Sequence, residues 1–352
     1  MQFLHCWPTK LLIRLKDYIF SMSVRETTVL SRTDLKYLLI DSLNLYSNNV
    51  VFIDGNNPYR FSINKKNFYI LIKNIHESGE NRPNQDECRI QISRTKNFNP
   101  AINSKENVII LGYFHDERVF AAWNPFLFSE RFNEKKNVSL FSRFSIQTSA
   151  SKNGIDNYTD QDSQSVISFK PEYLGLYLEN FESMHLLKKN DLQDLITKSD
   201  ETNIGNSFDQ HTYAGNTITV THQRYTRDPA FKKGVYEAYD FKCAICGIQL
   251  ELIEAAHIVP HSHEKGTDEI SNGICLCALH HTAYDKSLIF FDDKFNVKVN
   301  DEKMEYLKKI GQDSGIYDFQ KLSFEKIKLP NNPIFRPKIE NINLANQIRG
   351  IV

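Results

Sequence analysis

The chain lacks any apolar run long enough to cross a membrane. The apolar residues near its N-terminus are interrupted by Arg14, Lys16 and Asp17, and no small-residue cleavage site of a signal peptide follows them. Met22 offers a later start than Met1. These absences predict a cytoplasmic protein that has no membrane partner.

Cysteine, glycine and proline are also scarce, with 6, 14 and 11 copies among 352 residues. So few cysteines exclude a disulfide scaffold. Four of the six lie between positions 243 and 277, which indicates metal binding in a reducing compartment. With 41% hydrophobic and 24% charged residues, the composition is typical of a globular protein, and the length is sufficient for two or three domains.

The chain has no excess charge of either sign, because 43 Lys and Arg residues balance 43 Asp and Glu residues. Nucleic-acid-binding proteins are often basic, but local patches matter more than the sum. Neutrality is therefore only a weak argument against a DNA or RNA partner.

Residues 1–187 form the first predicted domain. A stripe of leucines within residues 27–46 predicts a helix. Over residues 50–180, short runs rich in Val, Ile, Phe and Tyr alternate with turn signals, a pattern typical of antiparallel strands. A second helix is expected over 173–187. The sequence therefore predicts an α+β protein whose N-terminal domain is mostly antiparallel β with flanking helices.

The C-terminal half divides into three predicted segments. Residues 188–216 are polar and predict a linker, residues 217–330 a second domain, and the Pro- and Asn-rich residues 331–352 a tail. Within the second domain we expect a helix over 228–239 and a strand pair over 287–299.

Two pairs of metal ligands stand in the second domain. Cys243-x2-Cys246 and Cys277-x2-His280 supply three thiolates and one imidazole, a normal tetrahedral set for structural zinc. The alternative is that these are unrelated buried residues. Cys275 is a rival ligand, but the x2 spacing favours Cys277, and we interpret Cys275 as a core residue.

A second set of polar residues is interleaved with the zinc ligands. His257 lies near the end of an expected strand, and Asn272 follows fifteen residues later. A helix that begins near position 279 places His281 and Asp285 one turn apart on the same face. Two side chains of one helix then reach a single metal ion, and His257 on the facing strand approaches the same point.

This segment, about residues 240–295, resembles the HNH nucleases, a zinc-stapled ββα-metal family found in restriction enzymes, homing endonucleases and nuclease toxins. His257, Asn272 and His281 occupy the three positions that give the family its name. The strings around them are most similar to the subgroup found in restriction endonucleases. The resemblance implies a C-terminal zinc-stapled ββα-metal domain that hydrolyses phosphodiester bonds.

The chemistry of such a site follows from its residue types. A neutral His257 takes the proton from an attacking water, and the side-chain oxygen of Asn272 is expected to bond the other ring nitrogen and fix the tautomer. A single Mg²⁺ or Mn²⁺ ion on His281 and Asp285 binds the scissile phosphate. The alternatives are a turn role for Asn272 and a helix-terminal role for Asp285.

One position departs from the pattern of the family. Many members carry a metal ligand immediately before the base histidine, where this chain has Ala256. Glu254 lies on the same strand face and is the candidate replacement. His261 and His263 are interpreted as loop residues near the substrate.

The N-terminal domain is the expected DNA-recognition module. Arg side chains read base edges, and Lys and Arg bind phosphates. The candidate DNA-binding residues are Arg82, Arg89, Arg94, Lys135, Lys136 and Arg143. The alternative is a solvated charged face. Asp54, Asp86 and Glu87 also suggest a second acidic nuclease centre, but no lysine stands in the usual place.

We therefore predict a metal-dependent DNA endonuclease of restriction type, either type II or modification-dependent, whose substrate is double-stranded DNA. With one site per chain, cutting both strands needs two chains or two binding events, so a homodimer is expected. A cognate DNA methyltransferase is the other candidate partner. The alternatives are a catalytically inactive zinc-stapled nucleic-acid-binding protein and a less specific antiphage or toxin nuclease.

Overall fold

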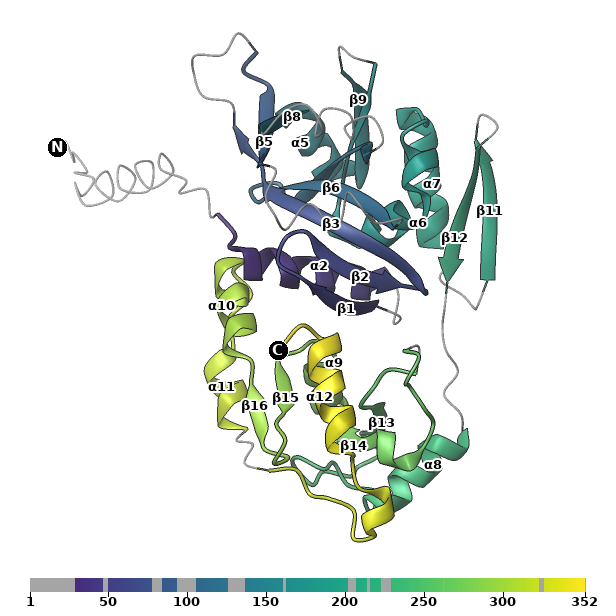
Figure 1. Ribbon diagram of the computed structural model, residues 1–352, viewed down its shortest axis with the longest axis vertical. Helices are drawn as coiled ribbons and strands as arrows, with labels where there is room; N and C mark the ends of the chain where they lie inside the picture. Colours follow the sequence, from purple (N-terminus) through teal and green to yellow (C-terminus); the bar gives the residue numbers. More distant parts are fainter. Residues whose placement is uncertain are drawn as a thin grey trace, which may run out of the picture.

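The computed structural model describes residues 29–46, 50–77, 84–93, 106–125, 137–160, 163–201, 207–213, 216–222, 229–261, 263–322 and 326–351. Figure 1 shows them as a larger N-terminal unit stacked on a smaller C-terminal unit. Across these ranges, no helix combines the length and the apolar character that a membrane span requires.

A seven-stranded sheet forms the centre of the N-terminal unit, in the order β1-β2-β3-β6-β7-β10-β9. β3 and β6 pair in parallel, and every other pair is antiparallel. The mostly antiparallel domain predicted from the sequence is thus confirmed. The strands are β1 (Val50–Gly55), β2 (Tyr59–Ile63), β3 (Lys66–Asn74), β6 (Asn107–Phe114), β7 (Val119–Trp123), β9 (Ile155–Thr159) and β10 (Ser165–Phe169).

Helices cover one face of this sheet. They are α2 (Arg32–Tyr46), the 3₁₀ turn η2 (Pro171–Tyr173) and α6 (Leu174–Met184), and their apolar side chains share one core with the sheet. Ser31 and Asp34 form a reciprocal cap, since each side chain accepts the backbone N–H of the other, at 2.7 and 3.2 Å. This cap starts the predicted N-terminal helix at Arg32.

A second sheet of three strands, β4-β5-β8, lies over the opposite face. Its elements, with the helix that follows β8, are β4 (His76–Glu77), β5 (Glu87–Ser93), β8 (Asn137–Arg143) and α5 (Phe144–Asn153). Buried and exposed residues alternate along β5 and β8, so one face of this sheet is apolar and packs inward. The outer face is polar.

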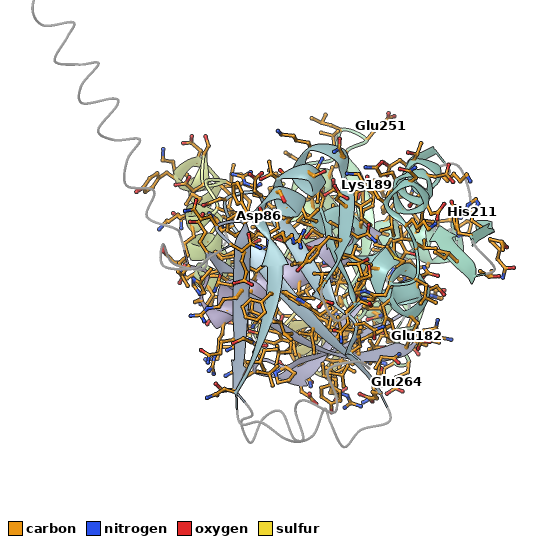
Figure 2. All side chains as sticks on the ribbon, turned by 90° about the horizontal axis from the view of Figure 1, so that it is seen from above. Asp86, Glu182, Lys189, His211, Glu251 and Glu264 are labelled. Carbon is orange, nitrogen blue, oxygen red and sulfur yellow. The ribbon has the colours of Figure 1, made fainter. Side chains whose placement is uncertain are left out.

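Asp86 caps α5 and is not part of an acidic nuclease centre. Its carboxylate accepts hydrogen bonds from the backbone N–H and the hydroxyl of Ser145, at 2.7 and 2.6 Å, and its position is labelled in Figure 2. Asp54 lies on β1 in the other sheet and pairs with Arg60 at 3.7 Å. The two carboxylates therefore have separate structural partners.

The linker expected over 188–216 needs correction, because most of it is regular structure. It contains α7 (Lys189–Glu201), β11 (Ser207–Tyr213) and the start of β12 (Asn216–His222). Leu192, Leu195 and Ile196 are buried in the core of the N-terminal unit. Their spacing is helical, but three apolar residues in a polar stretch are a weak signal.

The C-terminal unit is built from short elements around its own apolar core. Two hairpins, β13–β14 and β15–β16, form separate two-stranded sheets, and the second is the strand pair predicted over 287–299. The elements are α8 (Pro229–Ala238), β13 (Ile253–His257), η3 (Ile270–Asn272), β14 (Gly273–Cys277), α9 (Ala278–Asp285), β15 (Ile289–Phe291), β16 (Val297–Val299), α10 (Asp301–Lys309), α11 (Ile316–Lys321), η4 (Pro333–Phe335) and α12 (Ile339–Ile348).

The expected C-terminal tail also needs correction. Its helix α12 buries Ile342 and Ala345 in the core that holds β13, β14 and α9. The C-terminal residues are thus an integral part of the second unit, which does not end near residue 330.

The two units meet where α2 packs against α10 (Figure 1). Lys303 binds both carboxylate oxygens of Asp41 at 2.6 Å, and Lys309 binds Asp34 at 2.5 Å. Lys303 is almost fully buried, and burial lowers its pKa despite the adjacent Asp41. The units are therefore joined by two ion pairs, each with one buried partner, as well as by the chain.

Candidate active site and metal centre

Local structure brings the four predicted zinc ligands together. Cys243 and Cys246 lie on a tight turn that closes with the Gly247 N–H donating to the Cys243 carbonyl at 2.9 Å. Gly247 has φ of +76°, a conformation that favours glycine. Cys277 ends β14 and is the N-cap of α9, so His280 follows one helical turn later.

The distances between the four ligand atoms fit a tetrahedral ion. His280 Nδ1 lies 3.4 Å from Cys243 Sγ and 3.2 Å from Cys277 Sγ, and the sulfurs of Cys246 and Cys277 are 3.9 Å apart. In a tetrahedral site, zinc bonds of about 2.3 Å to sulfur and about 2.0 Å to nitrogen place a sulfur about 3.5 Å from the nitrogen and about 3.8 Å from another sulfur. All four atoms lie within 4.8 Å of one another. The group can therefore hold a zinc ion.

Cys275, the rival ligand, is fully buried in the core of the C-terminal unit and is not one of these four residues. It lies two residues before Cys277 on β14. Because its sulfur is not in the group of four converging ligand atoms, Cys275 is a packing residue.

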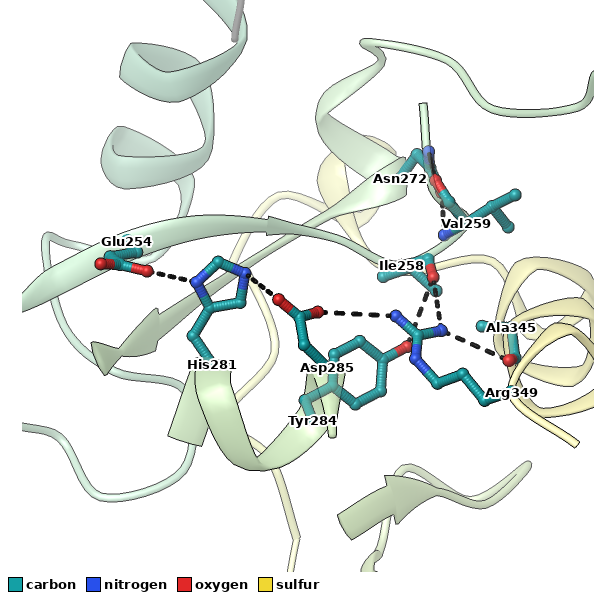
Figure 3. Close-up of polar contacts among 9 residues, drawn as sticks. All are labelled: Glu254, Ile258, Val259, Asn272, His281, Tyr284, Asp285, Ala345 and Arg349. Carbon is teal, nitrogen blue, oxygen red and sulfur yellow. Dashed lines mark hydrogen bonds and ion pairs between the residues drawn. The ribbon is translucent and has the colours of Figure 1, made fainter. Parts of the chain in front are cut away.

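The α9 face that is turned toward β13 carries the second candidate metal site (Figure 3). His281 Nε2 lies 3.2 Å from Asp285 Oδ2, and Glu254 is bonded to the opposite ring nitrogen, Nδ1. The imidazole of His281 is 7% exposed, whereas the carboxylates of Glu254 and Asp285 are about half exposed. The site therefore opens to solvent on its carboxylate side.

Glu254 was the candidate substitute for the ligand missing at Ala256. In the structure it holds Nδ1 of His281, the ring nitrogen that faces away from Asp285. This is the arrangement of a carboxylate that orients a metal-binding histidine through its second nitrogen. Ala256 itself is fully buried in the core and offers no ligand atom.

Arg349 reaches this site from the C-terminal helix, and the sequence analysis missed it (Figure 3). Its guanidinium stacks 4.0 Å from the ring of Tyr284, lies 3.9 Å from Asp285 Oδ1 and donates to the Ile258 carbonyl at 3.1 Å. It is nearly buried. Arg349 thus links α9 to the end of the strand that carries His257.

The signal for α12 was present in the sequence. Ile342, Ala345 and Ile348 are spaced three residues apart and are all buried. Nothing local, however, indicates that Arg349 meets Asp285.

His257 ends β13 and is only 12% exposed. Its ring stacks on Phe231 of α8, with centroids 4.0 Å apart and planes 9° from parallel. Its Nε2 atom lies 2.9 Å from Asp268 Oδ1, and the other oxygen of Asp268 lies 3.3 Å from His261 Nε2. The stack on Phe231 therefore fixes the plane of the His257 ring, and the carboxylate of Asp268 fixes the position of its Nε2 atom.

The expected bond between Asn272 and His257 does not form. The fully buried Asn272 side chain accepts the Val259 N–H at 3.0 Å and donates to the carbonyls of Val259 and Thr267, at 3.0 and 2.9 Å. An amide satisfies one donor and one acceptor of a buried backbone segment simultaneously, so it closes the loop between β13 and β14. Asn272 acts on His257 only through this backbone.

The loop histidines differ from each other. His261 is half-exposed and shares Asp268 with His257. His263 is partly buried, which lowers its pKa, and its Nδ1 accepts the Lys265 N–H at 3.1 Å.

Two of the candidate DNA-binding residues lie on the outer face of the three-stranded sheet. Arg89 pairs with Phe141, and Arg143 pairs with Glu87 and lies 4.5 Å over the ring of Tyr158. Arg82, Arg94, Lys135 and Lys136 lie outside the described residues.

Two segments of the chain match known families. Residues 66–178 match the family described as Methylase-associated X1, and residues 243–292 match the HNH endonucleases. The second match contains the zinc ligands, His257, His281 and Asp285, and it identifies the metal-rich segment as an HNH nuclease domain. No curated protein matches the chain.

A solved structure titled "Modification dependent TagI restriction endonuclease" is similar at 11% identity, covering 85% of this chain and 84% of that one. The TM-score of this match is 0.26.

Proposed function

We propose that the chain is a metal-dependent DNA endonuclease of restriction type, with His257 as general base and His281 and Asp285 as ligands of one divalent ion. The observation that carries this proposal is the site geometry inside a segment matched by the HNH endonucleases. A constrained imidazole ends β13, and a second imidazole stands 3.2 Å from a carboxylate on α9.

The donor set fits the implied metal. Mg²⁺ prefers oxygen ligands, so a set of one imidazole nitrogen and one carboxylate oxygen suits Mn²⁺ and related ions better than Mg²⁺. With either ion, water and phosphate would complete the coordination. When bound, such an ion supplies positive charge to the scissile phosphate and to the leaving 3′ oxygen. Glu254 and Arg349 hold the two ligands in place from either side.

The protein side of the reaction is a proton transfer. A water molecule attacks phosphorus, its proton passes to His257, and the bond to the 3′ oxygen breaks as that oxygen takes a proton from solvent water. His257 is almost buried against Phe231, which restricts rotation of its ring. The zinc group has no part in this step and stabilises the hairpin and α9 that carry the reacting residues.

We assign target selection to the N-terminal unit. The outer face of its three-stranded sheet carries Arg89 and Gln91 on β5 and Asn137, Ser139 and Arg143 on β8. Arg, Asn and Gln are the side chains that bond base edges in the major groove. The match of this unit to a methylase-associated family supports a methyltransferase partner and a restriction role.

Duplex cleavage with one site per chain requires a second chain or a second binding event. We therefore propose a homodimer on double-stranded DNA as the cutting species.

One observation favours a different function. The position before the base histidine is Ala256, which offers no metal ligand, and the carboxylate of Glu254 is bonded to Nδ1 of His281. A zinc-stapled protein that binds DNA without cutting it would tolerate this loss.

Cleavage of plasmid and phage DNA, modified and unmodified, separates the two functions. Wild type with Mg²⁺ or Mn²⁺ is expected to give discrete fragments that disappear in His257→Ala. Binding without cutting by both proteins, on every substrate, would support the inactive binding protein.

A further inference from the structure

We propose that Asp268 is the positioning residue of His257, taking the place expected for Asn272. The inference rests on the proposed function for its catalytic consequence, but its structural part stands alone. Asp268 lies in the loop between β13 and β14, and its two carboxylate oxygens contact the Nε2 atoms of His257 and His261, at 2.9 and 3.3 Å.

The loop is folded so that Asp268 must face His257. Asn272 binds the carbonyl of Thr267, the residue immediately before Asp268, and both backbone groups of Val259. At Gly266 the loop passes so close to itself that an added Cβ would lie 2.1 Å from the Pro260 carbonyl oxygen. These contacts bring residues 266–268 against the end of β13, where His257 stands.

The carboxylate sets the tautomer of His257. An ionised carboxylate only accepts hydrogen bonds, so the bond at 2.9 Å requires the proton of the neutral ring to be on Nε2. The lone pair is then on Nδ1, which becomes the basic nitrogen. The stack on Phe231 holds the ring plane, so the direction of that lone pair is fixed as well.

This arrangement also accounts for the proton during cleavage. The water proton moves to Nδ1, and the imidazolium that forms retains its Nε2 proton toward Asp268. The negative charge of Asp268 stabilises this cation without accepting the proton. His261, on the second oxygen, restrains the carboxylate from rotating away.

The direct test is the tautomer of His257 in the zinc-loaded full-length protein, read from long-range ¹H–¹⁵N NMR spectra. Wild type is expected to show the Nε2–H form. Asp268→Ala should lose that preference, whereas Asp268→Asn should retain it, because the amide oxygen still accepts the bond. Glu264→Gln is the matched control, since Glu264 is an exposed acidic residue of the same loop at the edge of the molecule (Figure 2).

An Nδ1–H form in wild type, or an unchanged tautomer in Asp268→Ala, would overturn the proposal. Because this readout needs no cleavage, it gives an answer even if the protein cuts no DNA, in which case the nuclease function fails and the placement of Asp268 is still decided.

The catalytic part is tested by single-turnover cleavage at saturating DNA. Asp268→Ala is expected to cut about 100-fold more slowly, the lower end of what general base catalysis contributes, with DNA affinity unchanged. Asp268→Asn should lie between it and wild type, because it keeps the tautomer and loses the charge. Cleavage by Asp268→Ala at the wild-type rate would show that Asp268 does not position the base.

Discussion

The two units of this molecule are stabilised in different ways. The N-terminal unit has a seven-stranded sheet with a large apolar core on one face and a second core on the other. In the described residues, the C-terminal unit is built from two-stranded hairpins and short helices. The difference is that the first unit has two extensive apolar cores, whereas the second combines a smaller core, which includes α12, with a four-residue group that can hold a metal ion.

Loss of zinc should have the largest effect, because it should destabilise the C-terminal unit and leave the N-terminal unit folded. Cys277→Ser takes away one of four ligands, and structural zinc contributes about 10–16 kcal/mol of apparent binding energy, against a typical domain stability of about 5–15 kcal/mol. We expect the C-terminal unit to unfold while the N-terminal unit still melts cooperatively. Zinc content and a two-transition melting curve measure this.

Cys275→Ala is the matched control for zinc removal, because it alters a buried cysteine two residues away that is not in the ligand group. It should retain one zinc per chain. A full complement of zinc in Cys277→Ser would contradict the assigned ligand set.

Loss of the second metal site should affect chemistry and not folding. His281→Ala removes a ligand from α9 without touching the zinc group, so cleavage should fall by about 1,000-fold, or about 4 kcal/mol, while both melting transitions remain. Single-turnover rates with a Mn²⁺ titration measure the change. Thr282→Ala, at an exposed position of the same helix, should cut normally. Equal loss in both variants would indicate a damaged helix instead of a lost ligand.

Acid should weaken the N-terminal unit. His185 is buried between Tyr177 and the Ser165 carbonyl, and burial lowers its pKa to about 4. The unfolded chain, with an ordinary histidine pKa of about 6.5, binds this proton more readily. Stability is therefore lost as pH falls below about 6.5, by at most about 1.4 kcal/mol per pH unit from this group.

The measurement is the melting temperature of the N-terminal unit between pH 7.5 and 4.5. His185→Gln removes the titrating ring, so its curve should depend less on pH than that of wild type. Parallel curves for the two proteins would show that His185 does not titrate on unfolding.

Arg349→Ala should give the smallest effect on metal affinity and cleavage. It removes the ion pair to Asp285, the stack on Tyr284 and the bond to Ile258. Loss of such an outer partner of a metal ligand typically costs about 10- to 100-fold in metal affinity or activity, and we expect the lower value. Arg349→Lys should recover only part, because lysine lacks the planar fork. A metal affinity unchanged in Arg349→Ala would show that Asp285 is held without it.

Local patterns in the sequence predicted the parts that depend on near neighbours. The x2 spacings of Cys243–Cys246 and Cys277–His280 predicted the four-residue metal group, and His281 and Asp285 were predicted to share one face of α9. Alternation of apolar residues predicted the strands of the N-terminal unit. In each case the predictive signal is a short spacing or a local alternation, even where the contact it implies joins distant residues, as between Cys246 and Cys277.

Contacts between distant segments were not predictable in this way. Arg349 meets Asp285 across 64 positions only because α12 packs into the core of the second unit. Asn272 was expected to bond the ring of His257. Instead its amide bonds the N–H and the carbonyl of Val259 in the buried loop backbone, and Asp268 contacts the His257 imidazole. These partners are decided by how distant segments pack and how the loop closes, and neither produces a repeating pattern of residues in the sequence.

The most direct test of the account is to measure DNA binding and single-turnover cleavage side by side for wild type and His257→Ala. The account predicts that the variant retains zinc and binds the same DNA within about 2-fold, because the N-terminal unit selects the target. Its cleavage rate should fall by at least about 100-fold, because the general base is gone. Cleavage by His257→Ala at the wild-type rate would contradict the assignment of the active site.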